Sequence, residues 1–171
     1  TVNFSIIYGA GATNLSQQLD IKRKEATELI SNYFAQYNGL KTYMDETVEF
    51  AREHGYVKTL LGRKRKLRDI NSRNGLIRSN AERIAINTPI QGSAADMIKI
   101  AMINIHKALK DGNFKTKMIL QVHDELVFDV FKPELEKVKP IIENEMKNAM
   151  PNLQVPILVG MDTGKDWLEA H

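Results

Sequence analysis

Residues 118–130 read MILQVHDELVFDV, two apolar runs separated by the polar trio His123, Asp124 and Glu125. Each run is short and rich in β-branched, aliphatic and aromatic residues, which is typical of a strand. A polar trio between two such runs predicts a strand, a turn and a second strand over residues 117–131. The chain is therefore expected to contain a small antiparallel sheet.

The residues after this hairpin predict one helix and one further strand. Pro133 suits the first turn of a helix, which is expected to run to about Met150. Residues 155–159, VPILV, predict a final strand, and a polar tail with the single tryptophan, Trp167, follows it.

Residues 74–109, before the hairpin, carry a helical pattern. Pro89 lacks an N–H for the carbonyl of Ala85 and would clash with it, so two helices or one sharply kinked helix are expected. Small residues at 92–95 would allow close packing there. The core stripe of the second half is expected to contain Ile98, Met102, Ile105 and Leu109.

The N-terminal part is predicted to be mostly helical. Residues 2–8 predict a helix that stops at Gly9-Ala10-Gly11, followed by a polar turn. Amphipathic helices are expected over 22–37 and 40–54, and a short hairpin over 56–67 around Gly62. The fold class is therefore α+β, a helical part followed by a small antiparallel sheet with covering helices.

The composition is that of a soluble globular protein. The 171 residues are 43% hydrophobic and 26% charged. No apolar run approaches the roughly 20 residues that span a bilayer, so no membrane association is expected. The N-terminal residues show no signal peptide. The absence of cysteine fits the reducing cytoplasm and excludes thiolate zinc sites.

Positive charge is concentrated in one part of the sequence. Residues 58–83 contain nine Lys or Arg and two acids, whereas residues 84–171 contain ten bases and twelve acids. A local basic stretch indicates phosphate contact, although a solvated charged surface has the same composition. The net charge of +3 is too small to decide between them.

The trio at 123–125 is a candidate metal site. An ionised carboxylate at the rim of an apolar hairpin favours a cation partner, and Mg²⁺ binds through one or two carboxylates together with substrate phosphates. The alternative is an ordinary polar turn.

Two further patterns have helical spacing. Arg83, Asn87 and Gln91 stand at i, i+4 and i+8 and would share one face of a continuous helix, where they suit phosphate, sugar and minor-groove edges. Phe4 and Tyr8 stand at i and i+4, as a stacking platform or as part of the core.

In combination these stretches resemble the motifs of DNA polymerase family A. NFSIIYGAG at 3–11 is similar to the second half of the family's fingers motif, and RIAINTPIQGSAADMIK at 83–99 to the helix pair that follows. LQVHDELVFDV at 120–130 is similar to the metal-binding motif of the palm, and GKDW at 164–167 to the end of such chains. The resemblance covers essentially all 171 residues.

The resemblance implies a DNA-directed DNA polymerase with part of the fingers at 1–55 and part of the palm at 56–171. It implies two Mg²⁺ ions in the complete enzyme, with primer-template DNA and deoxynucleoside triphosphates as partners. It assigns metal binding and catalysis to Asp124 and Glu125. It assigns nucleotide contacts to Phe4, Tyr8 and Gly9, and DNA contacts to Arg83, Asn87, Gln91 and His123.

Some features of the family have no match in this sequence. A phosphate-binding Lys precedes the position of Thr1 in the family, with an Arg four residues earlier, and a second catalytic Asp lies in an upstream DYSQIELR-like motif. GRKRKLRDI at 62–70 also departs from the family's GRxRYLPDI, so its DNA contact is unassigned. We therefore expect a C-terminal piece of a longer chain that is inactive alone. We also expect its palm sheet to have an exposed edge prone to self-association.

Two other functions fit part of the pattern. A single-subunit RNA polymerase shares the fingers tyrosine and an HD pair, but usually has Ser after the Asp, so Glu125 and the QGSAAD segment favour a DNA polymerase. A non-catalytic DNA-binding module would use only the basic hairpin and the row of Arg83, Asn87 and Gln91. Its DNA binding would survive the loss of Asp124.

Overall fold

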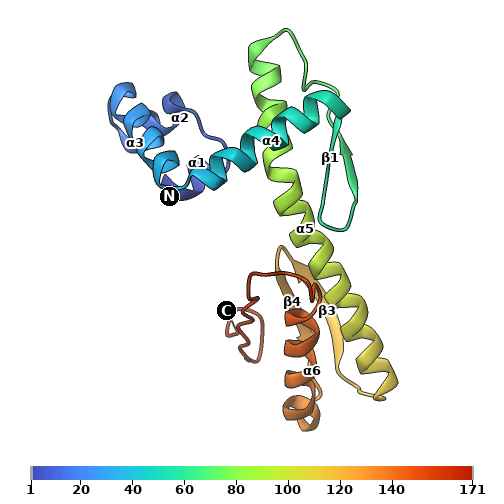
Figure 1. Ribbon diagram of the computed structural model, residues 1–171. Helices are drawn as coiled ribbons and strands as arrows, with labels where there is room; N and C mark the ends of the chain where they lie inside the picture. Colours follow the sequence, from blue (N-terminus) through green and yellow to red (C-terminus); the bar gives the residue numbers. More distant parts are fainter. Residues whose placement is uncertain (1, 171) are drawn as a thin grey trace. The chain divides into compact units, whose positions relative to one another are not determined.

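The computed structural model describes residues 2–170, which cluster into two compact units (Figure 1). Unit 1 ends at Ser93 and unit 2 begins at Ala94. The described residues form helices and two separate two-stranded antiparallel sheets, which confirms the predicted α+β class. Helix α5 (Gly75–Asp111) contributes its first half to unit 1 and its second half to unit 2.

Three helices form the N-terminal part of unit 1: α1 (Val2–Ile7), α2 (Ala12–Leu19) and α3 (Arg23–Gln36). Ile6, Leu15 and Ala26, one from each helix, are buried together. The predicted polar turn over the α2 segment is wrong. Leu15 is fully buried between its neighbours, and Ala12 and Leu19 pack against the same cluster, so tertiary packing stabilises this short helix.

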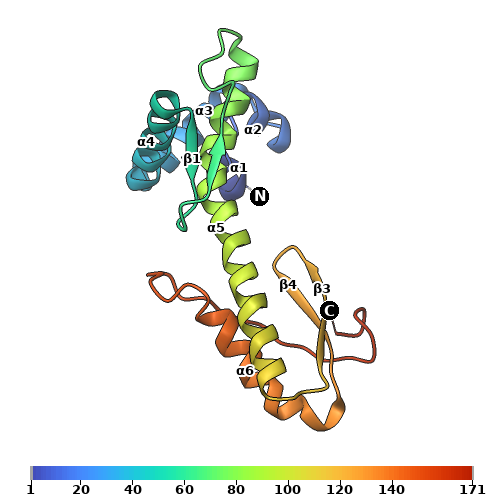
Figure 2. The same ribbon diagram turned by 90° about the vertical axis from the view of Figure 1, so that its right-hand side faces the viewer.

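Helix α4 (Asn38–His54) leads through Gly55 into strands β1 (Tyr56–Lys58) and β2 (Lys64–Lys66). The strands pair antiparallel, and Gly62, with φ of 81°, lies in the connection as predicted. The core beneath them contains Ala51 of α4, Val57 of β1 and Ala85 of α5. Figure 2 shows the hairpin beside the first half of α5.

Helix α5 is continuous through Pro89, so the predicted alternative of two separate helices is wrong. Side-chain bonds reinforce the backbone on both sides of the proline. The Thr88 hydroxyl donates to the carbonyl of Ile84 (2.6 Å), and the Ser93 hydroxyl donates to the carbonyl of Pro89 (2.5 Å). Thr88 and Ser93 are themselves buried, so packing holds this segment helical against the proline's cost of about 3 kcal/mol.

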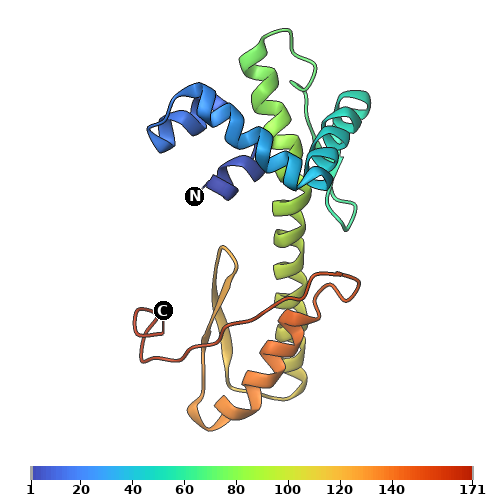
Figure 3. The same cartoon turned by 60° about the vertical axis from the view of Figure 1, so that its left-hand side comes forward.

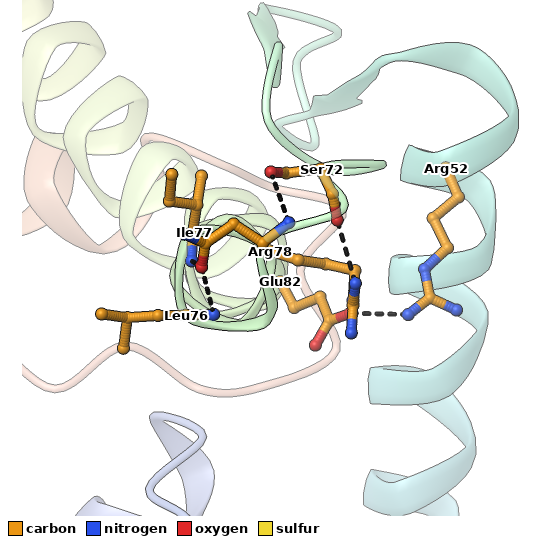
Figure 4. A network of polar contacts seen from close by, with 7 residues as sticks. Arg52, Ser72, Leu76, Ile77, Arg78 and Glu82 are labelled. Atoms are coloured by element: carbon orange, nitrogen blue, oxygen red, sulfur yellow. Dashed lines mark hydrogen bonds and ion pairs between the residues drawn. The ribbon is translucent and has the colours of Figure 1, made fainter.

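A polar network fixes the start of α5 against α4 (Figure 4). The Asn74 side chain accepts bonds from the N–H groups of Leu76 and Ile77, which caps the helix. Glu82 forms an ion pair with Arg52 of α4 at 2.5 Å and lies 3.8 Å from Arg78 of its own helix. These contacts place the next turn of α5, which carries Arg83.

Unit 2 contains strands β3 (Lys117–Val122) and β4 (Glu125–Asp129), the 3-10 turn η1 (Lys132–Glu134) and helix α6 (Leu135–Lys147). Figure 3 shows the hairpin and α6 beside the second half of α5. Its core joins Ile105 and Leu109 of α5 to Val138 and Ile142 of α6, with Phe128 packed against them.

The β3–β4 sheet has two strands among the described residues. Its register shifts between Met118 and Leu120, which leaves Ile119 without a Cα partner and 61% exposed. The predicted strand at 155–159 is wrong, because this segment has no strand structure and its Val155 is 66% exposed. A strand needs a hydrogen-bonded neighbour, and in the described chain no strand pairs with this segment.

The predicted functional division between residues 55 and 56 stays a prediction, and the core that contains Ala51 and Val57 crosses it. Among the described helices, none combines the length and the apolar character that a membrane span requires.

Candidate functional site

The end of α1 and the first half of α5 meet in unit 1. Gly9 follows α1 with φ of 80°, a left-handed conformation that suits glycine. The Asn87 side-chain amide donates to the Tyr8 carbonyl at 3.5 Å. A Cβ on Gly9 would lie 3.2 Å from Cγ of Arg83, so the arginine stem packs against the glycine backbone. The predicted nucleotide-binding and DNA-binding residues of this unit are therefore neighbours.

Phe4 and Tyr8 form an exposed aromatic pair on α1. Their rings are stacked, with centroids 6.3 Å apart and planes 16° apart. Phe4 is 66% exposed and Tyr8 is 39% exposed, while Ile6 on the same helix is buried. The core alternative for these aromatic residues is therefore excluded in this structure, and their rings are available to stack on a planar ligand.

Arg83, Asn87 and Gln91 form one polar row, because α5 continues through Pro89. The side chains of Arg83 and Gln91 are exposed and make no hydrogen bond or ion pair with other described residues. The Asn87 Oδ1 atom is buried without a hydrogen-bond partner among residues 2–170. The row thus offers a guanidinium and an amide to an external ligand.

The basic β1–β2 hairpin is docked on α5 just beyond this row. The Leu60 N–H donates to the Ser93 hydroxyl (2.9 Å), and the Arg63 guanidinium donates to the Gly92 carbonyl (3.0 Å). Arg65 donates to the Thr88 hydroxyl at 3.3 Å. Two of the basic residues therefore hold the hairpin in place, a role that the sequence did not indicate because it depends on long-range packing.

A pocket of about 190 Å³ lies beside Arg83, the first residue of the polar row, also within unit 1. Gly9 and Arg83 line it together with Glu82, the residue paired to Arg52. Sequence reasoning missed Glu82, whose ion pair joins positions 30 residues apart.

The trio at 123–125 forms the turn of the β3–β4 hairpin in unit 2. Val122 pairs with Glu125, so His123 and Asp124 make a two-residue turn. His123 has φ of 53°, and its carbonyl accepts a bond from the Gln121 side chain at 2.6 Å. His123 and Asp124 are exposed, and Asp124 has no hydrogen bond or ion pair to other described residues. The carboxylate is free to take a ligand.

The comparisons with known proteins agree over the whole chain. The model of the family described as DNA polymerase family A matches residues 1–169. The chain belongs to DNA polymerase family A.

The chain is also similar to bacterial DNA polymerase I sequences over the same length. The chain is 52% identical to DNA polymerase I of Streptococcus pneumoniae serotype 4 and 49% identical to that of Caldicellulosiruptor bescii, each over 169 residues and 99% of this chain. It spans about a fifth of the length of these curated relatives, 19% and 20% respectively.

A solved structure confirms the fold. The POL domain of Pol1 from M. smegmatis, in complex with DNA primer-template and dNTP, matches 98% of this chain with a TM-score of 0.95 and 42% identity. The match covers 30% of that domain's chain. The DNA polymerase resemblance is thereby confirmed over the RNA polymerase alternative.

The metal chemistry expected of family A is only partly supplied here. The described residues contain no group of three or more His, Asp or Glu side chains that could hold a metal ion. Asp124 and Glu125 are hard oxygen ligands, and Mg²⁺ is commonly held by one or two carboxylates plus phosphate oxygens. Asp124 and Glu125 therefore fit part of a magnesium site.

Proposed function

We propose that this chain forms the part of a DNA-directed DNA polymerase that grips the primer-template and the incoming deoxynucleotide. The main observation in favour of this proposal is the contact between Asn87 and the Tyr8 carbonyl, because it joins the exposed aromatic pair to the polar row. The solved relative, which was determined with primer-template and dNTP, supports the same partners.

Each part of the site would then have a distinct task. Phe4 and Tyr8 stack on or beside the incoming nucleotide, with Gly9 leaving room for Arg83. Arg83, Asn87 and Gln91 contact the minor groove, whose acceptors lie in similar positions in every base pair, so the row tests pairing shape without reading sequence. His123 lies near the primer terminus.

Asp124, supported by Glu125, would hold Mg²⁺. When bound, two such ions activate the primer 3′-hydroxyl and stabilise the leaving pyrophosphate. The hairpin presents the Asp124 carboxylate at an exposed turn, where it needs no rearrangement to reach a cation. The cysteine-free composition is consistent with work in the cytoplasm, in DNA replication or repair.

Primer extension in the polymerase that carries this chain tests the proposal. Asp124→Asn should nearly abolish nucleotide addition and leave primer-template affinity unchanged, because it removes the negative charge that binds the metal ion and removes no phosphate contact. Glu136→Gln, an exposed acid on α6, is the matched control. A large loss of DNA affinity with catalysis retained would refute the role of Asp124.

The isolated 171-residue chain provides a second test. With Mg²⁺ and four deoxynucleotides it should bind primer-template but not extend it, since one carboxylate pair cannot fix two ions. Extension above that of its Asp124→Ala variant would contradict the proposal that the metal site is shared.

A further inference from the structure

A second pocket lies in unit 2, at the open end of the β3–β4 hairpin. It has a volume of about 570 Å³ and is lined by residues from the start of β3, the end of β4 and the segment into η1. The lining residues are Lys115, Lys117, Asp129, Val130, Phe131, Lys132 and Pro133. We refer to it as the lysine pocket.

More positive than negative charge lines the lysine pocket. Lys115, Lys117 and Lys132 line it, and Asp129 is the one acid among its lining residues. None of the three lysines forms an ion pair with another described residue. Lys117 and Asp129 are opposite in the strand register, yet they make no salt bridge. The Lys117 and Lys132 ammonium groups are therefore available to an anion from outside, whereas the Lys115 charge also acts on the Glu134 carboxylate.

Hydrogen bonds to Glu134, which we call the Glu134 staple, join the segment before β3 to η1 at the pocket wall. The Glu134 carboxylate accepts bonds from the Lys115 N–H (3.0 Å), the Thr116 N–H (3.0 Å) and the Thr116 hydroxyl (2.8 Å). The Phe131 N–H donates to the same Thr116 hydroxyl at 3.3 Å. The negative charge of Glu134 is thus used within the fold, and the backbone beneath the lysines is fixed before any ligand arrives.

An aromatic ring accompanies the charges. Phe131 lines the pocket and remains 44% exposed, and the Lys115 ammonium lies 4.7 Å from its ring centroid. A positively charged groove beside an exposed aromatic ring is the combination that binds single-stranded nucleic acid, through phosphate contact and base stacking.

The lysine pocket is separate from the Asp124 turn. Lys117 and Val122 are the two ends of β3, and at about 3.3 Å per residue they lie roughly 17 Å apart. A ligand in the pocket would not contact the carboxylates at the turn.

We propose that the lysine pocket binds the backbone of a single-stranded nucleic-acid segment, with a base stacked on Phe131. Ammonium groups bind phosphates as point charges without a fixed geometry. Stacking on a phenyl ring accepts every base. The site would therefore be insensitive to sequence and would act in addition to the primer-template contacts of unit 1.

Salt-dependent binding of a fluorescent oligothymidylate to the protein tests the charges. Each phosphate contact to a single strand contributes roughly 0.7 to the steepness of the plot of log affinity against log salt concentration. The triple variant Lys115→Ala, Lys117→Ala and Lys132→Ala should therefore make this plot less steep by about 2. The control replaces Lys107, Lys110 and Lys137, exposed lysines of unit 2 outside the pocket, by alanine. Equal slopes for the two triple variants would overturn the proposal.

Phe131→Leu separates stacking from charge. It should weaken oligothymidylate binding about fivefold or more while leaving the salt slope unchanged. Ultraviolet cross-linking of a bromouracil oligonucleotide should label the peptide that contains Phe131, as read by mass spectrometry. Labelling confined to other peptides would overturn the proposal, as would equal competition by polyglutamate of the same charge. Primer extension should be unaffected by all these variants, so failure here would leave the proposed function intact.

Discussion

The side-chain amide of Asn87 donates to the backbone carbonyl of Tyr8 across 79 positions of sequence, at 3.5 Å. The contact joins the end of α1 to the middle of α5, a helix that continues through Pro89. Because the acceptor is a backbone atom, it fixes the position of residue 8 without restricting the tyrosine ring. The Tyr8 ring therefore stays exposed while the Tyr8 backbone is held in place.

Gly9→Ala should destabilise the protein by about 1–2 kcal/mol, because alanine is strained at φ of 80°. The new Cβ would also press on the Arg83 stem at 3.2 Å and weaken primer-template binding. Gly160→Ala is the control, since φ there is not positive and no atom lies within 4 Å of its Cβ. Urea denaturation of both variants measures the difference, and equal stabilities would contradict the argument.

Gln91→Ala should weaken binding of the polymerase to primer-template by about 1–3 kcal/mol if the lost bond leaves a buried partner unpaired. Arg83→Ala should act in the same direction. The matched control is Gln36→Ala, an exposed glutamine on the last turn of α3. Fluorescence anisotropy with a labelled duplex reports the change, and an effect of Gln36→Ala as large as that of Gln91→Ala would argue against the row.

Glu134 should make the stability of unit 2 depend on pH. Burial opposes its ionisation, but bonds from Lys115 and Thr116 and the nearby Lys115 charge outweigh that effect and hold the pKa below its ordinary value of 4.5. A depressed pKa gives stability that is present above pH 4.5 and is lost as the pH falls through the lower folded value. Thermal unfolding should therefore separate wild type from Glu134→Gln at pH 7.

That difference in unfolding temperature should close as the pH falls from 4.5 through the lower folded pKa of Glu134, because the wild-type carboxyl is then protonated. Glu136→Gln, on the first turn of α6, should follow the wild type across the whole range. A constant difference between wild type and Glu134→Gln down to pH 2 would show that charge is not what the staple contributes.

The exposed β3 edge should make the isolated chain self-associate. Ile119 is at the register shift and exposed, and unpaired edges of apolar strands recruit other strands. Ile119→Lys should reduce the association that light scattering detects with increasing concentration. Ile103→Lys, at an exposed isoleucine on α5, should not. A monomeric wild type at high concentration would contradict the prediction.

The elements that sequence predicted best have strong local signals. Helices α3 and α4 are long enough for their apolar periodicity to be recognised, and the β3–β4 hairpin has turn residues between two β-prone runs. Helix α2 was missed because Leu15 is its one fully buried residue and finds its partners in α1 and α3. The strand at 155–159 was predicted from composition, which does not reveal whether a pairing neighbour exists.

Sequence spacing predicted which residues belong to the candidate site, but it did not predict the contacts between them. The i, i+4, i+8 row required α5 to continue through Pro89, and local rules argued against that. Its helical course depends on Thr88 and Ser93, whose hydroxyl bonds no periodicity reveals. The contact from Asn87 to Tyr8 and the Glu134 staple likewise join segments that are distant in sequence.

The packing of the β1–β2 hairpin on α5 couples residues 59 and 92. A Cβ at Gly92 would lie 2.6 Å from Cγ2 of Thr59, and the Thr59 hydroxyl accepts a bond from the Arg63 N–H, which holds that methyl group in place. Any side chain at 92 therefore requires the Thr59 side chain to move. Serine at 59 would keep the hydroxyl and remove the methyl group, so it would make room for alanine at 92.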